Sequence, residues 1–195
     1  AKTAVVADGG TVRVLAGTYN EAVLLDKLNL TVESLDGAAV TIIDIPDGTL
    51  TTGVKTFKNL GVITFDGFTV KDFTESGIIQ GYGERAGTTF HVLNNIVKPA
   101  GTYLRNGIQV SGADSTVIGN TVYGQYLTED WASTCIGVVN ASGVLVQGNT
   151  IYGPADNGIA VYSYTGEVSD VDVIENVIEG VDYPLSVDAY YSGST

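Results

Sequence analysis

The chain has 195 residues and a formal net charge of −13 at pH 7, with 9 Lys plus Arg against 22 Asp plus Glu. This charge argues against nucleic acid and anionic membrane surfaces as partners, because both are bound through basic patches. The single cysteine, Cys135, excludes an intramolecular disulfide, and no apolar run is long enough to predict a membrane span.

Short apolar strands separated by turns are predicted in order from the N-terminal part of the chain. The first strands are expected at 11–14, 22–25 and 30–32, and the next at 40–43, 54–57 and 62–65. Turn residues such as Gly17 and Asp36-Gly37 separate them. No helical periodicity interrupts the series, so we expect an all-β protein.

A repeat becomes regular in the second half of the chain. Each copy has a short apolar strand, a turn ending in an anchor residue, and a second apolar strand; the anchors are Gly67, Asn95, Asn120, Asn149 and Asn176. A third strand, usually containing Gly-Ile or Ile-Gly, completes each period of about 27 residues. Three strands per period without a helix predict a parallel β-solenoid of about seven coils.

The side chains around each anchor predict how the coils stack. Strand alternation places the valine three residues before the anchor on the same, inward side as the anchor itself. Those valines are Val92, Val117, Val146 and Val173. Stacked amides donate to one neighbouring coil and accept from the other, so we expect a structural asparagine ladder made of Asn95, Asn120, Asn149 and Asn176.

These motifs resemble a known superfamily. The run Gly10-Thr11-Val12-Arg13-Val14-Leu15-Ala16-Gly17-Thr18-Tyr19 resembles the opening of pectin-lyase-like right-handed β-helix proteins, and the later Gly-Asn-Thr-Val/Ile units resemble NosD-like parallel β-helix repeats. The resemblance implies one right-handed parallel β-helix domain over residues 1–195, either a fragment of a longer solenoid or a stacking unit in one. It does not choose a function, because the superfamily holds lyases, hydrolases, epimerases, esterases, adhesins and tailspikes.

In the carbohydrate-active relatives, the substrate lies along the strand that contains Gly-Ile here. Its outward positions are nearly free of ionisable groups: Leu24, Lys55, Ile79, Gln109, Gly137, Ala160 and Ser186. The neighbouring loops supply the catalytic candidates Arg105, Glu129 and Asp130, and the aromatic glycan-binding candidates Tyr82, Tyr103, Tyr126, Trp131 and Tyr162. The alternative is that the tyrosines fold over the coil edges and Arg105 forms a surface ion pair.

The acidic residues of the last coils are candidates for binding a metal ion. Asp170, Asp172, Asp182 and Asp188 lie close together in the sequence, and calcium is the metal that such carboxylates would suit. Their spacing is not that of a dedicated calcium loop, and solvated acidic turns explain them adequately. The sequence therefore predicts no cofactor, with calcium as the exception to test.

Two features favour self-association. The residues two before the anchor, Phe65, Leu93, Ile118 and Ile174, are expected to face outward as an apolar assembly stripe, unless a loop or a terminal segment covers them. Second, neither end of the sequence has the pattern of a polar or helical cap. Without a cap, the end coils of a solenoid expose unpaired strand edges that another copy can pair with.

The sequence therefore leaves two classes of function. The preferred one is an extracellular or cell-surface structural or adhesive protein that self-associates, head to tail into filaments or through the stripe. The alternative is an enzyme acting on polysaccharide, or a glycan-binding module. The bare strand and the scarcity of Arg and His favour the first class, and the aromatic loops favour the second.

Overall fold

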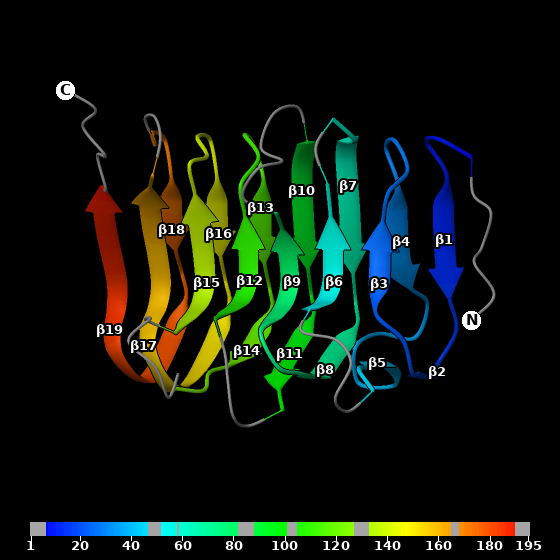
Figure 1. Ribbon diagram of the computed structural model, residues 1–195, viewed down its shortest axis with the longest axis horizontal. Helices are drawn as coiled ribbons and strands as arrows, with labels where there is room; N and C mark the ends of the chain where they lie inside the picture. Colours follow the sequence, from blue (N-terminus) through cyan, green and yellow to red (C-terminus); the bar gives the residue numbers. More distant parts are fainter. Residues whose placement is uncertain are drawn as a thin grey trace.

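The computed structural model describes residues 7–46, 52–57, 59–81, 88–100, 105–126, 133–164 and 168–189. Within these ranges all the regular secondary structure is β-strand, and every paired strand runs parallel to its neighbour. Figure 1 shows the strands stacked from β1 (Thr11–Val14) at one end to β19 (Val177–Ala189) at the other. The predicted all-β parallel solenoid is therefore confirmed.

The strands form a 7-stranded sheet and a 12-stranded sheet. The first sheet holds β1 and, in spatial order, β4 (Thr31–Ser34), β7 (Gly61–Asp66), β10 (Thr88–Leu93), β13 (Thr116–Ile118), β16 (Leu145–Gln147) and β18 (Asp172–Ile174). One arm of the second sheet holds β2 (Gly17–Tyr19), β5 (Thr41–Asp44), β8 (Thr69–Phe73), β11 (Ile96–Pro99) and β14 (Thr121–Tyr123). The other arm holds β3 (Val23–Leu25), β6 (Thr52–Thr56), β9 (Ser76–Gln80), β12 (Asn106–Val110) and β15 (Thr134–Val139), while β17 (Thr150–Ser163) and β19 run through both arms.

The core consists of residues stacked in register, one from each coil. In the 7-stranded sheet one inward row comprises Val12, Val32, Phe65, Val92, Val117, Val146 and Val173. On the opposite side of the core, Ile78, Ile108, Ile136 and Ile159 form another row, as the repeated Gly-Ile and Ile-Gly pairs predict. All four isoleucines are fully buried, so stacking of like residues is what fixes the register.

A left-handed backbone residue closes the turn between the first and second strands of the last four coils. Gly119 and Gly148 occupy it with φ of 67° and 63°, and Asn94 and Glu175 occupy it with φ of 53° and 57°. Glycine and asparagine adopt this conformation at little steric cost, which explains the repeated Gly-Asn pair. At Glu175 the same conformation is sterically less favourable, because the Cβ of a glutamate lies close to the backbone there.

The structure corrects the prediction for Phe65. The register pairs Phe65 with Val92 and Asp66 with Leu93, so the residue equivalent to Asn95 is Phe68 rather than Gly67. Phe65 therefore faces inward, is fully buried and stacks on Phe68 with ring centroids 4.5 Å apart. The outward position assigned to Phe65 belongs to Asp66, because the degenerate copy lacks an asparagine to mark its alignment.

Candidate functional site

The first candidate surface is the outer face of β9, β12, β15 and β17. Ile79, Gln109, Gly137 and Ala160 lie in register on it. Gln109 is 0% exposed, and Gly137 and Ala160 are also buried. The row from Ile79 to Ala160 holds no ionisable side chain, as the sequence predicts, and its middle part is not open to solvent.

Gln109 leaves one polar atom of this face without a partner. Its Nε2 donates to the backbone carbonyl of Gln80 at 2.9 Å, whereas its Oε1 is buried and accepts no hydrogen bond. Gln80 in turn accepts at Oε1 from the backbone N–H of Ser111 at 3.0 Å. A buried carbonyl oxygen without a donor costs free energy, so a water or a ligand hydroxyl would bind favourably there.

Gly137 leaves room for polar groups from neighbouring coils. A Cβ at this position would lie 3.5 Å from Asn106 Oδ1 and 3.6 Å from Tyr162 Oη. The rings of Tyr162 and Tyr164 pack edge to face, with their centroids 5.4 Å apart. One of the predicted aromatic candidates, Tyr162, is thus brought over the strand that the sequence analysis singled out.

Arg105 lies beside this face and is ion-paired with Glu75. Its Nη1 is 3.6 Å from Glu75 Oε1, and its backbone N–H donates to the carbonyl of Glu75 at 2.8 Å. Both side chains are partly solvated, so the ion pair contributes little to stability. The other candidates lie outside the described residues: Tyr82, Tyr103, Glu129, Asp130 and Trp131.

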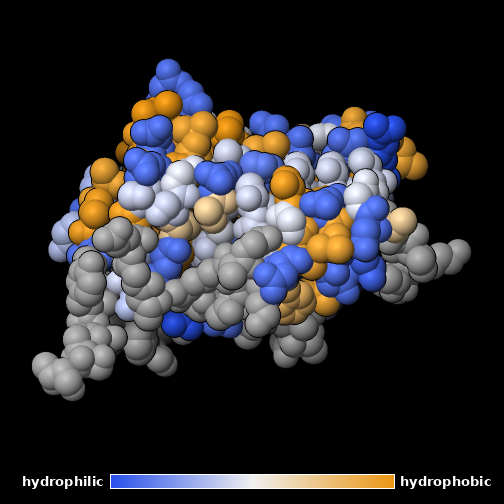
Figure 2. Space-filling view, turned by 90° about the horizontal axis from the view of Figure 1, so that it is seen from above, coloured by the Kyte–Doolittle hydropathy of each residue, from blue (hydrophilic) through white to orange (hydrophobic). Residues whose placement is uncertain are grey.

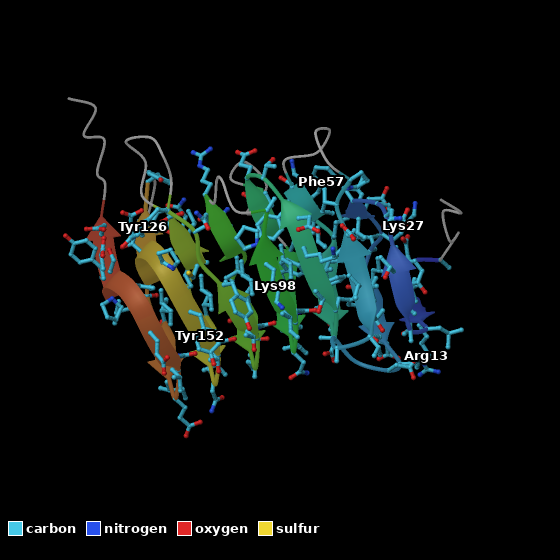
Figure 3. All side chains as sticks on the ribbon, turned by 90° about the horizontal axis from the view of Figure 1, so that it is seen from below. Arg13, Lys27, Phe57, Lys98, Tyr126 and Tyr152 are labelled. Carbon is cyan, nitrogen blue, oxygen red and sulfur yellow. The ribbon has the colours of Figure 1, made fainter. Side chains whose placement is uncertain are left out.

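Tyr126 reaches across the solenoid towards its last coil. Its hydroxyl donates to Asp182 Oδ1 at 2.9 Å, a hydrogen bond between residues 56 apart in the chain, and Figure 3 labels Tyr126 at that end. This hydrogen bond, with a smaller effect of burial, raises the pKa of Tyr126. Tyr126 and Tyr162 are thus the two aromatic candidates that the structure describes.

A group that the sequence analysis missed lies on the face seen in Figure 3, where Lys98 and Tyr152 are labelled. Tyr123 and Tyr152 are paired in register with ring centroids 5.4 Å apart, and Lys98 Nζ lies 4.9 Å from the Tyr123 centroid. The repeat contained a signal for it, because both tyrosines stand three residues after an anchor asparagine. The stack joins neighbouring coils, and both rings remain partly exposed.

The anchor asparagines are joined by a continuous chain of hydrogen bonds, which we name the amide ladder: Asn95, Asn120, Asn149 and Asn176. Each backbone N–H before the last donates 2.9 Å to Oδ1 of the next asparagine towards the C-terminus. Each Nδ2 also donates backwards, to the carbonyls of Phe65, Val92, Val117 and Val146. The hydrogen bonds therefore tie each asparagine to the coils on both sides of it.

Comparison with protein families identifies a family with this architecture. Residues 52–187 match the family described as the right-handed beta helix region, a stretch of about five coils. The chain belongs to this family. Comparison with characterised proteins and with solved structures gave no match.

Burial shifts the pKa of two titratable groups outside these surfaces, Cys135 and His91. Burial raises the pKa of Cys135 to about 12, so its thiol stays protonated and unreactive at neutral pH. The single histidine, His91, is half-buried, with Nδ1 2.8 Å from Thr116 Oγ1. Burial lowers its pKa.

The acidic side chains of the last coils are engaged separately. Asp182 accepts from Tyr126, Asp188 from Ser186 and Asp170 from Ser169. In the part of the β-helix that the structure describes, no three His, Cys, Asp or Glu side chains gather closely enough to hold a metal ion. Within the same ranges, no helix has the length and apolar character needed to cross a bilayer.

The remaining members of the proposed assembly stripe occupy one outward row of the β-helix. Leu93 and Ile118 are paired and half-buried, whereas Ile174 is 44% exposed. Polar residues interrupt this row, because Gln147 lies between Ile118 and Ile174 and Asp66 precedes Leu93. The row is therefore less apolar than the sequence suggested.

The last coil of the β-helix is its most exposed apolar region. Val187 is 72% exposed, Tyr183 63% and Leu185 52%. Leu185 and Val187 are paired with Ile159 and Val161, which are both buried, so their positions belong to the core but lack a covering coil. Figure 2 has this end at the left and shows hydrophobic surface there beside strongly hydrophilic residues.

Proposed function

We propose that the protein is an extracellular or cell-surface structural or adhesive β-helix that self-associates through the end of its solenoid. The observation that carries the proposal is the last coil, where Leu185 and Val187 hold core positions and remain exposed. Exposed edge strands with apolar side chains are templates for pairing with another chain. A partner coil would bury these side chains, and about 25 cal/mol per Å² of apolar surface favours that contact.

The same proposal includes a uniform solenoid of seven coils held by the amide ladder. A 7-stranded sheet supports the count, because each coil contributes one strand to it. The hydrogen bonds between successive asparagines support the role of the amide ladder in stacking. A regular cross-section along the axis is what end-to-end association requires.

Sedimentation velocity at increasing protein concentration tests the proposal. We expect species larger than the monomer that grow with concentration, and more so in physiological than in low salt, because copies of net charge −13 repel less when screened. Val187→Glu should reduce association, since it places a charge on the exposed edge. The matched control is Val62→Glu, at an exposed valine away from this end. A strictly monomeric particle at every concentration would refute self-association.

Glycan binding or turnover remains the second candidate function. The unpartnered Gln109 Oε1 and the position of Tyr162 over Gly137 favour it, because sugars offer hydroxyl donors and apolar ring faces. The absence of ionisable side chains from Ile79 to Ala160 argues more for binding than for catalysis.

A panel of neutral and acidic polysaccharides in affinity electrophoresis tests this candidate. We expect Arg105→Ala to weaken retardation several-fold if the glycan lies along β9, β12 and β15, because Arg105 flanks these strands. Arg13→Ala, which removes an exposed arginine at the other end, is the control. Unretarded migration of the wild-type protein with every polysaccharide would remove this function.

A further inference from the structure

We propose that the last coil of one copy pairs in parallel with the first coil of a second copy, so that every residue row continues across the junction in register. This inference rests on the proposed self-association and adds the identity and the alignment of the partner surface. The partner is the edge formed by β1, β2 and β3 of an identical chain.

The two ends of the described solenoid carry complementary strand edges. At one end β1, β2 and β3 are paired only with β4, β5 and β6, and at the other end β18 and β19 are paired only with β16 and β17. Because all strands are parallel, one end is the geometric continuation of the other. Such a head-to-tail contact does not close on itself and builds filaments.

The residue rows show which side chains would meet. The inward row that begins at Val12 ends at Val173, and the row beginning at Val23 ends at Leu185. At the next inward position the last coil presents Val187, the most exposed apolar side chain described, whereas Leu25 of the first coil is 1% exposed and is already covered by its own chain. Apolar residues therefore face apolar residues across the junction in the rows of Val12 and Val23, whereas the row of Leu25 also contains Thr56 and Gln80 inside the solenoid.

Charge favours this pairing over contact between two C-terminal ends. Residues 168–189 include no Lys or Arg and six carboxylates: Asp170, Asp172, Glu175, Glu179, Asp182 and Asp188. The opposite end carries Arg13 and Lys27, both labelled at that end in Figure 3, where they are paired with Glu33 and Asp26 and reduce the negative charge of this end. If the residue rows continue across the junction, Arg13 lies beside Ile174 and diagonally opposite Asp172. A long arginine side chain spans this diagonal spacing.

The amide ladder does not cross this junction. Asn176 is its last member, and the corresponding position of the first coil, two residues after Arg13, is Leu15. The backbone N–H of Asn176 therefore meets no amide from the second copy. We accordingly expect the junction to be weaker than any internal contact between coils, and the association to be reversible.

Cysteine pairing across the junction tests the register. Leu24 and Ser186 end the same outward row, so the proposed contact places their Cα atoms about 4.8 Å apart, within the range that a disulfide spans. The native Cys135 is buried and does not compete. We expect an equimolar mixture of Leu24→Cys and Ser186→Cys to form disulfide-linked dimers under mild oxidation, at least tenfold faster than either variant alone.

Lys55→Cys mixed with Ser186→Cys is the matched control, because Lys55 lies in the same row but one coil away from the edge. Sedimentation of the same samples separates the two proposals. Association without cross-linking above this control would overturn the register and leave self-association standing. A monomer in every sample would overturn both.

Discussion

Asn120→Ala should destabilise the protein by about 3–5 kcal/mol, among the largest effects expected for a polar substitution in this chain. Asn120 Oδ1 accepts from both the backbone N–H and Nδ2 of Asn95, and its own Nδ2 donates to the Val92 carbonyl and to Asn149 Oδ1. Alanine leaves several of these buried groups without partners, and each costs about 1–3 kcal/mol. Urea unfolding followed by circular dichroism measures the loss.

The last member of the amide ladder provides the control. Asn176 makes the same kinds of hydrogen bond but is only partly buried, so water replaces them after Asn176→Ala. We expect a loss of about 1 kcal/mol for this variant. Equal effects of the two substitutions would show that burial of the amide ladder does not govern its contribution.

Phe65→Ala should cost about 3–5 kcal/mol, because it removes a fully buried ring and leaves a cavity. The neighbouring coils stack Val32 and Val92 on Phe65, and Phe68 packs against its ring. A coil fixed between two others cannot collapse far into the vacated space. The free energy of unfolding from denaturant titration is again the measurement.

Leu93→Ala is the matched comparison, since Leu93 is only half-buried and faces outward on the adjoining strand. Its truncation should cost about 1 kcal/mol or less. If Phe65 belonged to an external stripe, both substitutions would have similar small effects on stability, and Phe65→Ala would instead weaken association.

The sequence predicts the fold well because a solenoid repeats one local solution. Val117, Asn120 and Val122 recur with nearly the same spacing in each later coil, so a single pattern determines strands, turn and inward face together. The prediction fails at Phe65, where Gly67-Phe68 replaces the Gly-Asn pair and the alignment shifts by one residue. Without the polar anchor, apolar alternation fits two registers equally well.

The candidate site was less predictable because its groups come from different coils. The hydrogen bond between Tyr126 and Asp182 joins residues that no local pattern relates. The choice of Glu75 as the partner of Arg105 depends on loop conformation, which spacing does not specify. The repeat defines the position of Gln109, but only the structure shows that it is buried.

The linear stacking of the coils has a consequence for how the molecule unfolds. Every internal coil is held from both sides, whereas the coil of β18 and β19, like that of β1, β2 and β3, has a described neighbour on one side only. In a linear array that depends on nearest neighbours, opening begins where one neighbour is missing and advances as a front. The amides of the two end coils, those of β19 among them, should therefore exchange with solvent before those of the internal coils. At the C-terminal end, opening of Asn176 would release Asn149 and then the next asparagine. Docking of a second copy would cover both ends and so slow unfolding.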